Sequence, residues 1–214
     1  MAKIETMSLR DQAYEAIKER IITLDYRPGE YLNEARVCED LGIGRTPVHQ
    51  ALDRLMLDGM VEVLPRKGVI VKPVSLDDVL NLVEVRLIHE PVCARLAAER
   101  GSAEELSQIL EFVDEAEDLV AAHDLKRLMV HDRAFHLAIS RAAHNPLLGE
   151  VISRVHDRIL RFWFIALSDR DQVRRVDNEH EKIGRAIASR DAEAAEATSR
   201  DHIESFRKRI TTAI

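Results

Sequence analysis

Cysteine, aromatic residues, glycine and proline are all scarce in this sequence. Its 214 residues include 2 Cys, 8 Gly and 6 Pro, and only 4% are aromatic. Two cysteines without a spacing pattern cannot form a disulfide framework, so reduced thiols are the simplest expectation. Few helix breakers, together with many Ala, Leu, Glu and Arg residues, predict a mainly α-helical protein.

Long apolar runs are missing as well. No apolar stretch approaches the roughly 18 residues that a membrane span needs. The first residues, MAKIETMSLRDQ, lack the apolar core of a signal peptide. These two absences predict a cytoplasmic protein without a membrane partner.

Excess positive charge is also absent. The net charge is −7, and residues 1–73 hold 11 Lys and Arg against 12 Asp and Glu. Such a chain is not suited to coating nucleic acid nonspecifically, because a large basic surface would be needed. Any DNA binding must therefore come from a local basic surface.

Residues 1–73 predict a first domain of three helices followed by a two-stranded hairpin. A helical apolar stripe ends at the Pro-Gly pair 28–29, and a short helix is expected at 33–41. A third helix runs to Gly59 and tolerates Pro47 in its first turn. In MVEVLPRKGVIVKPV the apolar period changes to two on both sides of PRKG. This order of elements predicts a winged helix-turn-helix domain.

Residues 74–214 predict a second domain made only of helices. Short polar breaks separate the helical patterns, and plausible N-caps follow them at Ser102, Asp124, Asn145 and Asp191. Six helices with short connections predict an antiparallel bundle. The helices are expected over 75–100, 103–121, 124–142, 146–167, 171–189 and 191–212.

The predicted third helix carries candidate DNA contacts at its start. In a helix-turn-helix pair, the N-terminal residues of the second helix reach base edges. Arg45 can contact guanine through two bonds or clamp a phosphate, and a solvated arginine is the alternative. Thr46 suits a phosphate at a helix start, and His49 lies one turn further on the same face. The wing tip adds the candidates Arg66, Lys67 and Gly68.

Four polar side chains fall on the apolar faces of three bundle helices. Asp132 and His136 are i and i+4 on one such face, whereas His131 is rotated off it and is expected to be solvated. His180 and His202 lie within the apolar stripes of the last two helices. Buried without partners, such groups cost roughly 2–7 kcal/mol each. They can satisfy one another by hydrogen bonds, or they can bind a divalent transition metal such as zinc or nickel.

Several ordered motifs resemble the GntR family of transcriptional regulators. PGE.L.E, LG..RTPV..AL.RL...G and the wing V...P.KG..V resemble the family's DNA-binding domain. HDRAFH, NEHEKIGRAIASRDAEAA and the later DHI resemble the FCD effector domain of its FadR-like branch. The resemblance implies DNA contacts at Arg45, Thr46 and the His49 position. It also implies metal ligands at Asp132, His136, His180 and His202.

The resemblance further implies how such a protein works. It implies a homodimer on a palindromic double-stranded DNA operator, most often a repressor, that responds to a small carboxylic acid effector. Arg86 looks like an effector contact through charge-assisted bonds, although a salt bridge with Glu84 or Glu90 is the alternative. Asn178 is a weaker effector-binding candidate and His156 another, with surface or bundle packing as the default for both.

Two departures from the family pattern bear on the operator. The family usually has arginine where this chain has His49. Many members also have arginine at the position of Ala35, where Arg36 is the neighbour here. Because of both departures, the operator sequence cannot be inferred from the family. They do not change the expected mode of binding.

Two other functions remain open from the residues. One is a metal-responsive regulator that has no organic effector. The other is a metal-dependent hydrolase, for which Glu179 and Glu181 are conceivable bases. Both lie about 100° off the face of His180 on a helix, and the sequence offers no independent nucleophile or phosphate loop. An enzyme is therefore not predicted.

Overall fold

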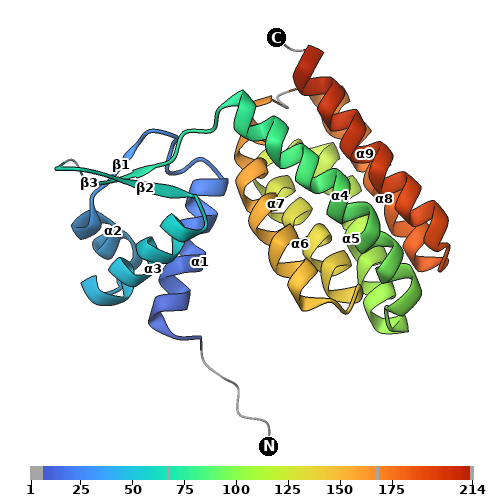
Figure 1. Ribbon diagram of the computed structural model, residues 1–214, viewed down its shortest axis with the longest axis horizontal. Helices are drawn as coiled ribbons and strands as arrows, with labels where there is room; N and C mark the ends of the chain where they lie inside the picture. The colour runs from blue at the N-terminus through green and yellow to red at the C-terminus, as the bar shows by residue number, and fades with distance from the viewer. Residues whose placement is uncertain (1–6, 67, 167–168, 213–214) are drawn as a thin grey trace, which may run out of the picture. The chain divides into compact units, whose positions relative to one another are not determined.

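The computed structural model divides the chain into two compact units. The first ends at Val74 and the second begins at Ser75. Each unit is described by itself (Figure 1). The backbone is described for residues 7–66, 68–166 and 169–212, and side chains are described for these residues except 163–166 and 212.

The first unit is a winged helix-turn-helix fold, as the sequence predicts. Its helices α1, α2 and α3 pack together, with α1 and α2 both against α3. Apolar side chains such as Ile17, Val48 and Leu55 are fully or almost fully buried between them. The helices span Leu9–Ile22, Glu34–Leu41 and Arg45–Leu57.

The wing contains one strand more than the sequence predicts. β2 (Val61–Leu64) and β3 (Gly68–Val71) form the expected antiparallel hairpin, and β1 (Tyr31–Leu32) pairs with the other edge of β3. The sheet order is therefore β1-β3-β2. A strand of two residues is too short to display alternating hydrophobicity, so the sequence pattern could not reveal it.

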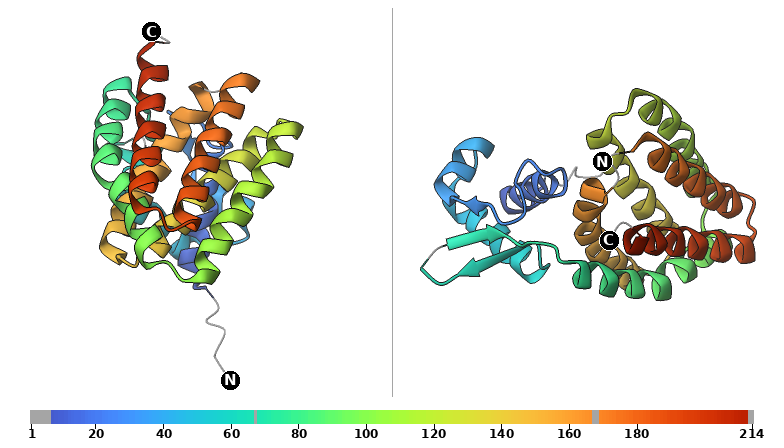
Figure 2. Two further views of the ribbon diagram at one scale, coloured as in Figure 1. Left: turned by 90° about the vertical axis from the view of Figure 1, so that its right-hand side faces the viewer. Right: turned by 90° about the horizontal axis from the view of Figure 1, so that it is seen from above.

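In its described residues, the second unit is the predicted bundle of six helices. Each described helix boundary lies within one residue of the predicted one, while the expected helix end at residue 167 lies outside the described residues. The four expected N-caps accept backbone N–H groups of their first turns. The longest helix, α4, packs against α9, and α8 packs against both α5 and α9 (Figure 2). The helices are α4 (Leu76–Arg100), α5 (Ala103–Ala122), α6 (Leu125–Ala142), α7 (Pro146–Ala166), α8 (Arg170–Ala188) and α9 (Ala192–Thr212).

A glycine brings α8 close to α5. A Cβ atom on Gly184 would lie 2.6 Å from Cγ2 of Val113, a separation that a side chain could not tolerate. His180 is one turn earlier on the same helix, so this close packing directs its ring into the bundle. In the part of the chain that the structure describes, no helix is both long and apolar enough to cross a membrane.

Candidate functional site

Five polar side chains from four helices converge inside the bundle. Helix α6 supplies Asp132 and His136, α7 supplies His156, α8 supplies His180, and α9 supplies His202. Each is buried, with no more than 9% of its surface exposed. The structure thus brings together the four residues that the sequence singles out, and it adds His156 to them.

The side chains of this cluster are within reach of one another. His136 Nε2 lies 3.3 Å from His180 Nε2. The Asp132 carboxylate lies between two rings, with Oδ1 3.5 Å from His180 Nε2 and Oδ2 3.4 Å from His156 Nε2. The ring centroids of His180 and His202 are 4.7 Å apart. One small ion could therefore be contacted from several helices at once.

The donor set of the cluster fits a transition-metal ion. Two overlapping triads, His136–His180–His202 and Asp132–His136–His156, each have ligand atoms within 4.8 Å of one another. Burial lowers the pKa of His136 to about 3 and the pKa of His180 well below its ordinary value. These imidazoles are therefore neutral near pH 7, which is the form that binds metals. Imidazoles with one carboxylate suit zinc, nickel and neighbouring ions.

Asp132 is the cluster member whose charge is least favourable without a cation. Burial raises the pKa of its carboxyl to about 7, although the Arg86 guanidinium acts in the opposite direction. A bound cation would stabilise the carboxylate form, because opposite charges within a few ångströms favour ionisation. The residues present could therefore hold a metal ion.

An outer carboxylate orients His202. Glu179 Oε2 lies 2.8 Å from His202 Nδ1, and Glu179 also accepts hydrogen bonds from Ser205 Oγ at 2.6 Å and Arg209 Nη1 at 3.1 Å. Burial opposes the charge of Glu179, but these contacts outweigh it and bring its pKa to about 2. A carboxylate on Nδ1 leaves Nε2 of the ring to face an ion. Glu179 is thus engaged in positioning rather than available as a base.

Arg86 forms a salt bridge with Glu90, which was the alternative to an effector contact. Its Nε donates to Glu90 Oε1 at 2.6 Å and its Nη2 to Glu90 Oε2 at 3.1 Å, with both residues buried in α4. Glu90 Oε2 also lies 3.6 Å from His136 Nδ1. The pair therefore lies at the edge of the cluster, beside a small pocket lined by Glu90, Cys93, Ala94, His136, Ile139, Ile152, Ile183 and Ser199.

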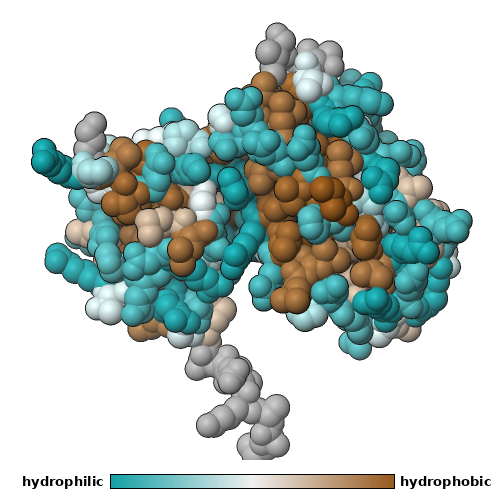
Figure 3. Space-filling model, viewed as in Figure 1, coloured by the Kyte–Doolittle hydropathy of each residue, from teal (hydrophilic) through white to brown (hydrophobic). Residues whose placement is uncertain are grey.

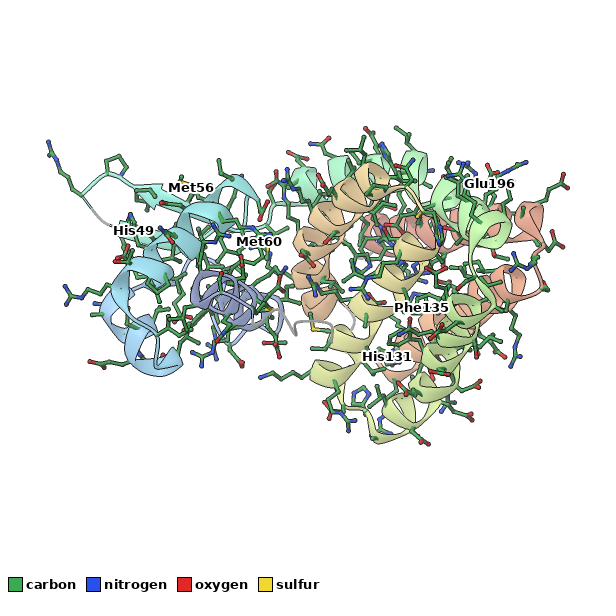
Figure 4. All side chains as sticks on the ribbon, turned by 90° about the horizontal axis from the view of Figure 1, so that it is seen from below. His49, Met56, Met60, His131, Phe135 and Glu196 are labelled. Atoms are coloured by element: carbon green, nitrogen blue, oxygen red, sulfur yellow. The ribbon has the colours of Figure 1, made fainter. Side chains whose placement is uncertain are left out.

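The structure places Asn178 on the surface, which was its default expectation, and contradicts the expectation for His131. Asn178 is exposed, because it is two residues and thus about 200° of helix rotation from the inward-facing His180. The His131 side chain is only 13% exposed rather than solvated. Its ring packs edge-on against Phe112 of α5, at 5.4 Å between centroids, because α5 covers that side of α6. His131 and Phe135 are labelled in Figure 4.

His156 is the cluster residue that sequence reasoning named only as a weaker effector-binding candidate, with surface or bundle packing as the default. One signal could have found it, since Ile152, His156 and Ile159 recur at the spacing of one helix face. Both isoleucines are buried, at 4% and 1% exposure, so the histidine between them also points inward. The sequence does not show which helix that face meets.

The candidate DNA contacts of α3 lie on the surface. Arg45, Thr46 and His49 are all exposed. The helix begins after Gly44, which makes no side-chain cap, and Pro47 carries no N–H group. The N–H groups of Arg45 and Thr46 are therefore suited to an anion at the helix start. A surface hollow lies between Arg45, β1, the start of α2 and the wing. It is lined by Tyr31, Leu32, Asn33, Glu34, Ala35, Arg45, Gly68 and Val69.

The wing tip is only partly described. Arg66 is exposed and has a φ of 62°, and Gly68 has a φ of 96°. A φ of this size favours glycine, which explains Gly68 at the turn. Lys67, a further predicted contact, lies outside the described residues.

His49 lies between carboxylates on the exposed face (Figure 4). Its Nδ1 is 3.1 Å from Glu34 Oε1 in α2, and its Nε2 is 3.8 Å from Asp53 Oδ2 one turn later in α3. The hydrogen bond with Glu34 and the two negative charges raise the pKa of His49 above its ordinary value. The ring therefore carries positive charge over a wider pH range than a free histidine.

Comparison with known proteins gives two family matches. Residues 9–71 match the family described as bacterial regulatory proteins, gntR family, and residues 81–205 match the FCD domain. The chain is 28% identical to the galactonate operon transcriptional repressor of Escherichia coli K12, over 96% of this chain and 98% of that one. It is 26% identical to the Glc operon transcriptional activator of the same organism, over 97% and 91%.

Solved structures support the fold. Escherichia coli McbR/YncC superposes with a TM-score of 0.86 at 21% identity, covering 97% of this chain and 99% of that chain. A regulator described as GntR from Rhodococcus superposes with a TM-score of 0.81 at 23% identity. At such identities the likeness concerns the arrangement of helices and strands.

Proposed function

We propose that this chain, which belongs to the gntR family of bacterial regulatory proteins and carries an FCD domain, is a metabolite-responsive transcriptional regulator. In this proposal residues 1–73 bind DNA, and residues 74–214 bind the effector and dimerise. The observation that carries the proposal is the buried cluster of imidazoles and one carboxylate beside a pocket in the helical unit. A repressor is proposed, by analogy with the relative named as an operon repressor.

The metal would be held by Asp132, His136, His180 and His202, with zinc or nickel as the ion. When bound, it would supply a Lewis-acid position for one oxygen of a small carboxylic acid. The neighbouring Arg86 would become a second anchor for that acid if its pair with Glu90 opened. Asn178 is exposed and is left out of the proposal.

A double-stranded operator would be contacted by the start of α3 and by the wing. Arg45 and Thr46 are proposed to meet a base edge and a phosphate, and Arg66, Lys67 and Gly68 the neighbouring backbone. An effector can change operator binding only if it binds the two conformations of the protein with different affinity. The bundle helices that hold the metal are the proposed element that changes.

The effector part of the proposal is tested by a thermal-shift screen of small carboxylic acids on metal-loaded protein. An acid present at about 100 times its Kd should stabilise the fold by about 2.7 kcal/mol. The same acid should have no effect after a chelator has removed the metal. Equal stabilisation of both forms would exclude the metal from the effector site.

A metal-responsive regulator without an organic effector is the second candidate. The observation that favours it is the Arg86–Glu90 pair, which neutralises the proposed second anchor. Titrating metal against operator affinity, with and without the acids, separates the two functions. If the second function is correct, metal alone changes the operator affinity and the acids leave the operator affinity unchanged.

A homodimer is proposed through the face that α4 and α7 share, two helices that pack together. Apolar side chains gather over this face (Figure 3). Ile88 and Val92 are one turn apart on α4, and Leu147 and Val151 one turn apart on α7. Their exposed fractions are 65%, 41%, 73% and 39%. Exposed apolar patches of this kind mark protein interfaces, and a two-fold dimer matches a palindromic operator.

The double variant Ile88→Glu, Val92→Glu should be monomeric in sedimentation velocity, because burying two carboxylates in an apolar interface is unfavourable. Its operator affinity should also fall, since the two half-sites are no longer linked. Val130→Glu is the matched control, on an α6 residue that is 43% exposed. A double variant that sediments as the wild type would place the dimer interface elsewhere.

Operator affinity should fall as the pH rises above the ordinary histidine pKa of 6.5. The pKa of His49 is raised, so its positive charge is present at and below pH 6.5 and is lost as the pH passes the raised value. Glu34→Gln should move this loss of operator affinity to lower pH.

His49→Arg should abolish the pH-dependent loss of operator affinity, because a guanidinium stays charged. It should also change the base preference within a randomised operator library, because a guanidinium can form two bonds with a base. An unchanged preference and pH profile in His49→Arg would remove His49 from the DNA interface.

A further inference from the structure

His156 is the one member of the cluster that the family resemblance does not assign. It comes from α7, which supplies none of the four proposed ligands. Its ring is 3% exposed and lies 4.3 Å, between centroids, from the ring of His136. Its Nε2 is 3.4 Å from Asp132 Oδ2. His156 thus contacts two of the proposed ligands directly.

We infer that His156 is a fifth protein ligand of the metal ion, an inference that rests on the proposed metal site. Metal–nitrogen and metal–oxygen distances are about 2.0–2.2 Å, so ligands of one ion lie within about 4.4 Å of each other. The His156, Asp132 and His136 donor atoms already lie within 4.8 Å of one another. His136 also belongs to the triad with His180 and His202, so the inference places one ion at the residue that the two triads share.

A hydrogen bond to Asp132 does not account for His156 equally well. The Nε2–Oδ2 distance of 3.4 Å exceeds the 2.7–3.2 Å that is usual for such a bond. His156 Nδ1 is buried and has no hydrogen-bond partner within the described residues. Metal ligation through Nε2, the nitrogen that faces Asp132, would give that nitrogen a strong partner.

The neighbouring residues hold His156 toward the cluster. Arg133, next to Asp132 on α6, forms a two-bond salt bridge with Asp157, next to His156 on α7, through Nε to Oδ1 and through Nη2 to Oδ2 at 3.2 Å. This pair sets the register of α7 against α6. The position of the His156 ring is therefore determined by the packing of α6 against α7.

Five protein ligands would change what the site can bind. A six-coordinate ion would retain one exchangeable position, so the carboxylic acid would bind through a single oxygen. Such a ligand set favours an ion that accepts five or six ligands over a closed tetrahedral zinc site. Within the proposed function, the metal ion would therefore have one coordination position left for the effector rather than two.

The test is titration of Co²⁺ into chelator-treated wild type, His156→Gln and the control His131→Gln. Four-coordinate Co²⁺ absorbs visible light strongly, five-coordinate Co²⁺ absorbs it less, and six-coordinate Co²⁺ absorbs it weakly. Wild type and His131→Gln should give the same weak bands. His156→Gln should give altered bands and about a 10-fold or greater loss of Co²⁺ affinity, since loss of even an outer partner of a metal ligand typically costs about 10–100-fold.

Three results would overturn the inference. Strong four-coordinate bands in wild type would leave no place for a fifth protein ligand. Unchanged bands and affinity in His156→Gln would remove His156 but leave the four-ligand site of the proposed function intact. Failure of wild type to bind Co²⁺, Ni²⁺ or Zn²⁺ would reject the metal site as a whole.

X-ray absorption of the metal-loaded wild type gives a count that does not depend on any variant folding. Four imidazoles per ion would support His156 as a ligand. Three imidazoles would exclude it, while agreeing with the site proposed from His136, His180 and His202.

Discussion

Replacing His180 by alanine is expected to empty the metal site and leave the helical bundle folded. The ring is buried among donors from α6 and α9, and its Nε2 lies within 3.5 Å of both His136 Nε2 and Asp132 Oδ1. Metal content, measured by elemental analysis, should fall from about one ion per chain to well below it. The variant keeps its helices because their caps do not involve this ring, whose contact with an apolar ring is that with Phe135, at 4.9 Å between centroids.

The same variant should lose the stabilisation that metal provides. At a free metal concentration of about 100 times the Kd, binding contributes about 2.7 kcal/mol. With a shift of about 2–4 °C per kcal/mol for a chain of this size, metal should raise the Tm of wild type by roughly 5–11 °C. It should not change the Tm of the variant.

His131→Ala is the matched control for this experiment. His131 is on α6 beside Asp132, but it packs against Phe112 and is not part of the cluster. The control should keep its metal and its metal-dependent rise in Tm. Full metal occupancy in His180→Ala would remove His180 from the site.

Replacing Arg45 by alanine is expected to abolish binding to the native operator at ordinary concentrations. A two-bond contact to guanine contributes roughly 1–3 kcal/mol, and a dimer makes the contact in two half-sites. The combined loss of about 2–6 kcal/mol corresponds to a decrease in affinity of roughly 30-fold to 10⁴-fold, measurable by footprinting. Metal content should be unchanged.

The control for the loss of charge is Arg141→Ala. Arg141 is an exposed arginine near the end of α6, in the helical unit. It should leave the footprint as it is in wild type. If Arg45→Ala protected the native operator as well as this control, the start of α3 would not be the reading surface.

The helices could be predicted closely because local signals define them. Ser102 and Ser75 each form a capping box with an acidic residue three positions later, and these contacts need only neighbouring residues. Gly42 ends α2 in the left-handed conformation with a φ of 64°. The family, shown by two model matches, was likewise readable from ordered motifs. Such features depend on short stretches of chain and so survive in the sequence alone.

The errors concern groups whose surroundings come from distant segments. His131 is covered by Phe112, which is 19 positions earlier in the chain, and β1 pairs with a strand about 40 residues later. Helix periodicity shows which residues share a face, but not whether another helix covers it. This is why His131 was expected in solvent.

The sequence by itself determined the order of helices, the winged helix-turn-helix and bundle classes, and the inward faces that carry Asp132, His136, His180 and His202. Only the tertiary structure decided that these faces meet and that His156 joins them from α7. It also decided that Glu179 lies beside Nδ1 of His202 and Glu90 beside Nδ1 of His136. The reason is physical, since capping and periodicity act over a few residues. A site built from four helices instead depends on contacts between residues that are far apart in the chain.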